Sequence, residues 1–303
     1  MGLGTNHLIS TEVASFIPEM WSDEIIATFK ANLVMAPLVH RINHNGRKGD
    51  RIHIPKPTRG SASSKAAETQ VTLIQNSDAE LAVDIDQHWE YSRLLEDFAD
   101  KQAVDSLRAF LTDDAGYALA TKVDSLLIQL GRYVQGGAGT AAYTTGYIGS
   151  NGTTAYVAGS NNEAALTDAA IRRSIQRLND SNVPLTNRKF VVPPTCLNDM
   201  LGIARFTEQA FRGEGSALAT GVIGRIYGVD VLVSTNADTT SGSNAARVAL
   251  LFQKDAFVLA EQMSVRAQVQ YKQEYLGTLF TSDMIFGVKE MRDEAAVALV
   301  VPA

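Results

Sequence analysis

The sequence predicts a mixed α+β fold in which a second lobe is inserted between a long helix and the strands that pack on it. Apolar residues recur every three or four positions through residues 96–135, which is typical of a long amphipathic helix. Helical and strand patterns alternate over residues 163–255 and indicate an α/β lobe. Alternating patterns return after residue 256 and indicate a closing set of strands.

The composition of the 303 residues is that of a globular protein, with 45% hydrophobic and 20% charged residues. A chain of this length predicts more than one lobe. Its net charge of −6 makes it a poor overall binder of duplex DNA or anionic membranes. Its one cysteine, Cys196, excludes an internal disulfide and a CxxC site. No membrane span or signal peptide is recognisable, so we expect a protein made and kept in a cytoplasm.

An arm and a two-stranded ribbon are predicted in the first third of the chain. We expect a short helix within the arm, residues 1–38. Residues 39–90 predict two strands around a polar excursion, because Ile52 and Ile54 alternate with polar neighbours and the alternation returns around Val83. A ribbon of two strands is marginal in water, so we expect it to pack on another surface.

The long helix predicted over 96–135 would span roughly 50 Å at 1.5 Å per residue. It leads into residues 133–162, which carry no charge and contain seven glycines from Gly136 onward, so we place a domain boundary there.

In the inserted lobe we expect a helix from Leu166–Asp168, a buried strand at 189–192, a helix after Pro193 and a strand at 226–233. Strands around 265–271, 284–288 and 295–301 are expected to pack on the long helix.

The sequence contains no constellation that predicts catalysis, a cofactor or a metal. GxxxxGK[ST] and GxSxG are absent, and the glycines of 213–224 form only part of a nucleotide-binding phrase, so we interpret them as a loop. His40 and His44 lack the HExxH pattern and are interpreted as surface residues. Cys196 at a helix start is interpreted as a buried thiol.

A split in charge is the strongest signal for function. Residues 41–65 hold seven bases and one acid, whereas residues 78–124 hold twelve acids and four bases. Two solvated faces would explain this pattern. The alternative is that the basic ribbon of one chain lies over the acidic helix of a neighbour, since complementary patches favour regular docking. Stacking on nucleic acid is disfavoured because the bases lack interleaved aromatic residues.

The order of these segments resembles the major capsid protein of tailed bacteriophages, with the Hong Kong 97-type fold. Local phrases at Arg225–Ser234 and Leu250–Ala260 resemble the family's strand entering the end of the inserted lobe and its phrase before the last strands. The resemblance implies an N-terminal arm, an extended loop, a peripheral domain with a spine helix, and an axial domain. These parts would be residues 1–38, 39–88, 89–135 with 256–303, and 136–255.

The resemblance implies a non-enzymatic protein without cofactors that self-assembles in the host cytoplasm. Pentamers and hexamers would form an icosahedral shell around double-stranded DNA, without sequence-specific contact and without a membrane. The extended loop would contact a neighbouring subunit through Arg47, Lys48, Arg51, Lys56, Arg59 and Lys65. The acidic surface it meets would be Glu96, Asp97, Asp100, Asp105, Asp113 and Asp114.

Two features of this sequence differ from those of some members of this family. No long scaffold-like segment precedes the loop, so we expect a separate scaffolding protein beside a portal. No Asn follows Asn244, so the acceptor for an isopeptide bond from Lys65 is missing and no covalent cross-link is expected. Two alternatives remain open: an encapsulin-type nanocompartment of the same fold, and an α/β enzyme with a ligand site in the axial lobe.

Overall fold

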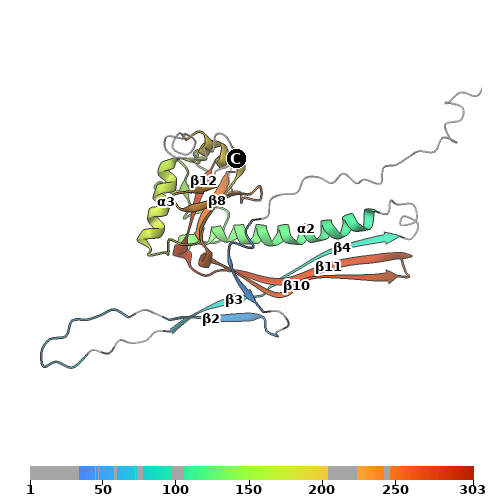
Figure 1. Cartoon of the computed structure of the whole chain (residues 1–303), viewed down its shortest axis with the longest axis horizontal. Coiled ribbons are helices and arrows are strands. Elements are labelled where there is room, and N and C mark those ends of the chain that lie inside the picture. Colours follow the sequence, from blue (N-terminus) through green and yellow to red (C-terminus); the bar gives the residue numbers. More distant parts are fainter. Residues whose placement is uncertain are drawn as a thin grey trace, which may run out of the picture.

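Three parts extend from one junction in the computed structural model of the chain (Figure 1). They are a block built on a six-stranded sheet, an elongated unit of a long helix on a four-stranded sheet, and a two-stranded hairpin. The hairpin and the elongated unit extend in opposite directions (Figure 1). The structure describes residues 34–44, 46, 48–57, 60–71, 73, 78–96, 106–203, 224–241 and 246–303. The helix expected within residues 1–38 lies outside these ranges.

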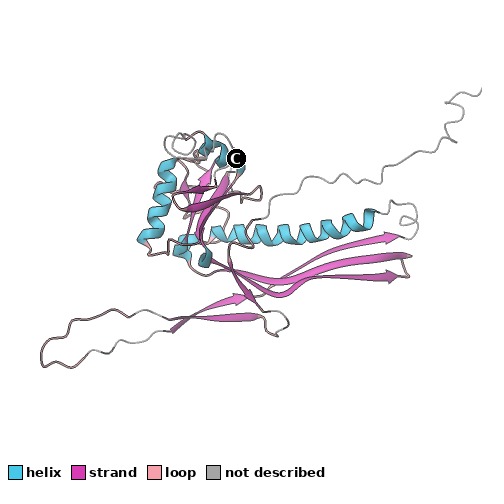
Figure 2. Cartoon of the chain, viewed as in Figure 1, coloured by secondary structure: helices cyan, strands magenta, loops and turns pink. Residues whose placement is uncertain are grey.

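The elongated unit has strand order β1-β10-β11-β4. β1 pairs parallel with β10, and the other pairs are antiparallel. Figure 2 shows the helix α2 lying along this sheet. The elements are α2 (Ser106–Gln129), β1 (His40–Asn43), β4 (Gln87–Glu96), β10 (Phe257–Lys272) and β11 (Gly277–Glu290).

Alternate residues of β4 face α2, as expected for a strand with one face against a helix. Lys122 of α2 lies over the Trp89 ring at 4.0 Å from its centroid. The Tyr91 hydroxyl donates to Asp114 of α2 at 2.8 Å. The period-two pattern of β4 therefore matches its place at the sheet edge beneath the helix.

The helix expected over 96–135 is wrong at both ends. Glu96 is the last residue of β4, and α2 ends at Gln129, followed by 3₁₀ turns at Leu130–Arg132 (η2) and Val134–Gly136 (η3). Gln135 (φ 55°) and Gly136 (φ 78°) have positive φ, which an α-helix cannot contain. The described helix of 24 residues is therefore about 36 Å long.

The block contains a sheet of order β5-β12-β9-β6-β8-β7, and its described residues include the helices α3 and α4. Thr167 caps α3 by accepting a hydrogen bond from the Ala170 amide, and Pro194 opens α4, as the sequence predicts. The elements are β5 (Tyr147–Ile148), α3 (Asp168–Asp180), β6 (Arg188–Val192), α4 (Pro194–Leu201), β7 (Arg225–Ile226), β8 (Val229–Val233), β9 (Arg247–Gln253) and β12 (Ala296–Val301).

Two expectations about strands are corrected here. The strand expected over 226–233 is a hairpin, since Tyr227 (φ 49°) and Gly228 (φ 82°) form a two-residue turn with positive φ at both positions. The strand β12 pairs with β9 and β5 in the block and does not join the sheet beside α2. All six residues of β12 are buried, and a strand buried on both faces belongs inside a covered sheet.

A polar cluster fastens the end of α2 to the block. Arg132 makes two hydrogen bonds to Asp238, at 2.7 and 2.9 Å, and the buried Tyr143 hydroxyl donates to the same carboxylate at 2.6 Å. The Asp238 hydrogen bond raises the pKa of Arg132, which therefore stays charged. The cluster therefore fixes the orientation of the helix relative to the block.

Candidate inter-subunit surfaces

The hairpin of β2 (Arg51–Pro57) and β3 (Asp78–Asp84) is anchored at its base to the chain's own sheet. Val83 of β3 is fully buried and packs with Val258 and Ala260 of β10, with Ile52 and Ile54 of β2 against this cluster. The expectation that the ribbon needs another surface is therefore met at its base within the same chain.

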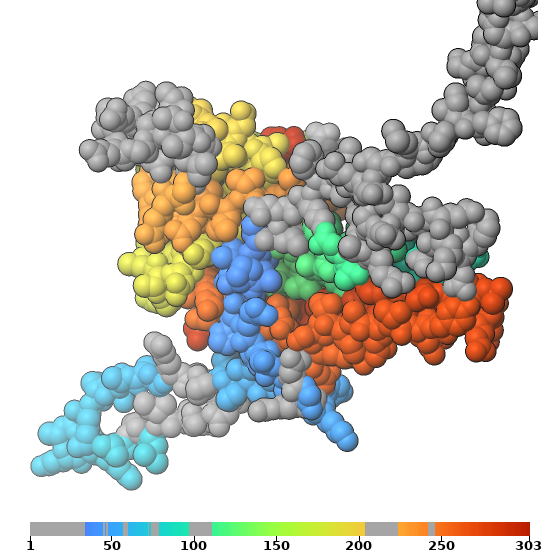
Figure 3. All heavy atoms as spheres, turned by 45° about the vertical axis from the view of Figure 1, so that its right-hand side comes forward, coloured from blue at the N-terminus to red at the C-terminus, as the bar shows by residue number. Residues whose placement is uncertain are grey.

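The rest of the hairpin projects from the body. Figure 3 shows it as a separate extension. All residues of 60–71 are exposed, and Val71 and Leu73 expose 63% and 87% of their surface. We call residues 60–73 the arm tip; they are the far end of this hairpin and are not part of the N-terminal arm.

The predicted basic residues differ in what they contact. Arg51 lies directly opposite Asp84 in the hairpin and donates to its carboxylate at 2.5 Å, which raises the pKa of Arg51. This pair holds the two strands together, so Arg51 is engaged within its own chain. Lys48, Lys56 and Lys65 are exposed. Arg47 and Arg59 lie outside the described residues.

The predicted acidic residues do not form one helical face. Glu96 is exposed at the end of β4, and Asp113 is exposed on α2. Asp114 is half-buried and accepts a hydrogen bond from Tyr91 within its own chain. Asp97, Asp100 and Asp105 lie outside the described residues. The acidic surface therefore comes from both the sheet and the helix.

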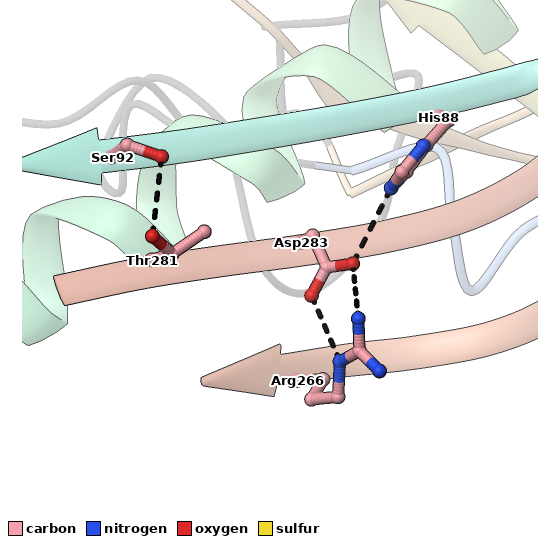
Figure 4. A network of polar contacts seen from close by, with 5 residues as sticks. All are labelled: His88, Ser92, Arg266, Thr281 and Asp283. Atoms are coloured by element: carbon pink, nitrogen blue, oxygen red, sulfur yellow. Dashed lines mark hydrogen bonds and ion pairs between the residues drawn. The ribbon is translucent and has the colours of Figure 1, made fainter. Parts of the chain in front are cut away.

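A polar network across three strands was not predicted from the sequence (Figure 4). Arg266 of β10 donates twice to Asp283 of β11, at 3.0 and 2.8 Å, and His88 of β4 lies 3.3 Å from the same carboxylate. Ser92 donates to Thr281 at 3.4 Å beside it. The hydrogen bond from Arg266 lowers the pKa of Asp283. The network ties the strands together, and only the pairing register brings its members side by side.

A second residue missed by the sequence reasoning is Asp124 of α2, whose side chain is buried. Its Oδ1 accepts hydrogen bonds from the amides of Val34 and Met35, at 3.0 and 2.8 Å. Its Oδ2 accepts from the Asn236 side chain at 3.2 Å. One carboxylate thus joins the N-terminal segment, the helix and the block.

Glu290 lies where the hairpin, the sheet and the block meet. Its side chain lines a cavity of about 330 Å³ together with Asp84, Asp86 and Lys289. Among the described residues, the buried Oε1 of Glu290 has no hydrogen-bond partner. Burial raises the pKa of Glu290 to about 7, and Asp293 adds to this effect.

The described residues offer little for chemistry. Within them, no three His, Cys, Asp or Glu side chains are grouped to hold a metal ion. The Cys196 thiol is buried and its pKa is raised by burial, so it is not a reactive thiolate. His40 lies 3.4 Å from Asp255 at the surface. No helix in this part of the chain is long and apolar enough to cross a membrane. The glycine phrase at 213–224 is largely outside the described ranges.

Comparisons with known proteins agree with this geometry. Residues 39–300 match the model of a family described as phage capsid protein. A chain in the solved structure of Mycobacterium phage Che8 is 24% identical, with a TM-score of 0.74, over 94% of this chain and 97% of that chain. The capsid of cyanophage P-SCSP1u is 18% identical, with a TM-score of 0.76, over 99% and 97%. The capsid of cyanophage Pam1 is 14% identical, with a TM-score of 0.76, over 99% of each chain. No curated protein matches.

Proposed function

Because this chain belongs to the phage capsid protein family, we propose that many copies of it form a closed icosahedral shell around the double-stranded DNA of a tailed phage. It has the Hong Kong 97-type fold and is a structural major capsid protein of the virion, not an enzyme. The alternative of an α/β enzyme is therefore wrong.

The exposed arm tip is the observation that supports assembly most directly. Leu73 is 87% exposed although covering a Leu side chain is worth about 2 kcal/mol. Val71, at 63% exposed, adds a second uncovered apolar side chain close by. The tip is directed away from the elongated unit of its own chain (Figure 1). A neighbouring copy would supply the cover.

We assign the parts of the chain to positions in the shell as the family's architecture implies. Residues 136–255 form the axial domain at the five-fold and six-fold centres, where pentamers and hexamers close. Residues 89–135 and 256–303 form the peripheral domain, and β12 contributes to the axial sheet. Residues 39–88 form the extended loop, and its exposed Lys48 and Lys65 meet acids such as Asp113 on a neighbour.

The charge of the chain suits an enclosing wall. A net charge of −6 disfavours tight binding to phosphates, so packaged DNA would touch the wall without sequence-specific contact and remain free to leave. A scaffolding protein and a portal are the further partners that we propose, with assembly in the host cytoplasm.

Electron microscopy and mass spectrometry of particles from infected cells test the shell. We expect this chain to be the main protein of icosahedral particles of megadalton mass, and its absence from such particles would overturn the proposal. The absorbance ratio at 260 and 280 nm of particles from infected cells tests the contents. Nucleic acid is expected, and a protein-only cargo would favour an encapsulin-type compartment.

Charge reversal tests the basic side of the interface. Lys48→Glu with Lys65→Glu should abolish particles while the subunit stays folded, since both side chains are exposed. Arg51 is left unchanged because its reversal would place two acids opposite each other within the hairpin. The matched control, Lys48→Arg with Lys65→Arg, keeps both positive charges and should leave the particles normal. Normal particles from the lysine variant would refute the charge pairing.

A further inference from the structure

A small apolar cavity lies between α2 and the far part of the four-stranded sheet. Its volume is about 120 Å³. Leu95 of β4, Leu111 of α2, Val269 of β10 and Phe280 of β11 line it, with Arg93 and Thr112 beside them. Val269 is 66% exposed, so the cavity is bordered by apolar surface that the described helix does not cover.

The size of this cavity suits one aliphatic side chain. An apolar cavity of about 150 Å³ in a protein interior holds a benzene molecule, so 120 Å³ is of the order of a single Leu side chain. An apolar lining also disfavours ordered water, which needs polar partners.

The arm tip carries a side chain that fits. Leu73 is the most exposed of the large apolar residues in the described part of the chain, and Val71 lies two positions before it. The arm tip and the cavity lie at opposite ends of the molecule (Figure 1). The Leu73 side chain of the same chain therefore cannot enter this cavity.

We infer that Leu73 of one copy inserts into this cavity of a neighbouring copy. The inference rests on the proposed shell and specifies the contact that the arm makes. One pair of charges around the two partners is complementary. The tip carries the exposed acid Glu68, and the cavity is lined on one side by the base Arg93.

A disulfide trap tests the contact. A chain with Leu73→Cys and Thr112→Cys is assembled, oxidised and run on a non-reducing denaturing gel. Because Cys196 is fully buried, it should not react. We expect a ladder of covalent multimers from particles and monomer from the unassembled subunit. The matched control pairs Leu73→Cys with Leu185→Cys, an exposed position on the block, and should give no ladder.

The outcomes separate this inference from the proposed function. Particles without a ladder would overturn the cavity contact and leave the shell intact. Particles from infected cells that lack this chain would overturn the shell itself.

If the cysteine pair prevents assembly, a second measurement tests the insertion. It is the subunit concentration at which half of the subunits are assembled, compared between the wild type and variants of Leu73. Leu73→Ala should raise it at least roughly tenfold, because burial of most of a Leu side chain is lost. Leu73→Met should leave it within about twofold. An unchanged value for Leu73→Ala would refute the insertion.

Discussion

Replacing Asp124 by Ala should destabilise the folded subunit more than any other single loss of a carboxylate on α2. The carboxylate accepts two backbone N–H groups, from Val34 and Met35, at 3.0 and 2.8 Å. Val34 is 6% exposed and Met35 is fully buried, so neither amide gains water when its acceptor is removed. A buried donor left without a partner costs about 1–3 kcal/mol. Two such donors sharing one acceptor give an expected loss of about 2–4 kcal/mol.

Two matched variants separate this effect from other causes. Asp124→Asn keeps an oxygen for the two amides but places an amide nitrogen opposite Asn236, so we expect a loss of about 1–2 kcal/mol. Asp180→Ala removes an exposed carboxylate from the last residue of α3 and should change stability by less than about 0.5 kcal/mol.

The assay is urea unfolding of the unassembled subunit at low protein concentration, analysed by linear extrapolation. A loss of about 3 kcal/mol is a large part of the 5–15 kcal/mol that stabilises a typical domain. The reasoning is refuted if Asp124→Ala unfolds with the same free energy as Asp180→Ala, because the two amides would then have found other acceptors.

Further predictions concern the junction and the end of α2. Burial raises the pKa of Glu290 to about 7, so the folded state keeps a proton that the unfolded chain releases near pH 4.5. The stability that this group contributes is therefore full below pH 4.5 and is lost as the pH rises through 7. Glu290→Gln should reduce the fall in urea midpoint between pH 5 and pH 8, and an unchanged fall would assign it to other groups. Gly137→Ala should cost about 1–3 kcal/mol, since the added Cβ would lie 2.2 Å from the Arg132 carbonyl oxygen. Gly136→Ala should cost about 1 kcal/mol through its φ of +78° alone, and equal losses for the two variants would contradict the clash. Mature shells should run as monomers on a reducing denaturing gel, since no Asn follows residue 244 as an acceptor for Lys65, and a ladder would overturn this expectation.

Local patterns in the sequence were sufficient for elements whose stability is encoded nearby. Thr167 and Asp168 predict the start of α3 because a cap acts within one turn. The hairpin of β2 and β3 follows from alternation around Ile52 and Val83, which face the same buried cluster. The order of segments resembled a capsid protein, and the family match confirms that resemblance.

The sequence was misleading where the fate of a segment depends on a distant partner. The helix was predicted to begin at residue 96, but pairing with Gly277 of β11 makes Glu96 the last residue of a strand. Likewise, the sequence of β12 predicts a strand but not the sheet to which it belongs, and its pairing with β9 places it in the block.

The sequence by itself determined the local elements, the charge split and the absence of motifs for chemistry, because each depends on composition or on neighbours along the chain. The tertiary structure decided which charges are engaged. Arg51 is opposed by Asp84 across a strand pair, and Asp124 meets the amide of Met35 from a segment 89 positions away. It also decided that Leu73 is left uncovered while a cavity lies open at the other end of the molecule. Such relations depend on distances in space, which the spacing of residues along a chain does not fix.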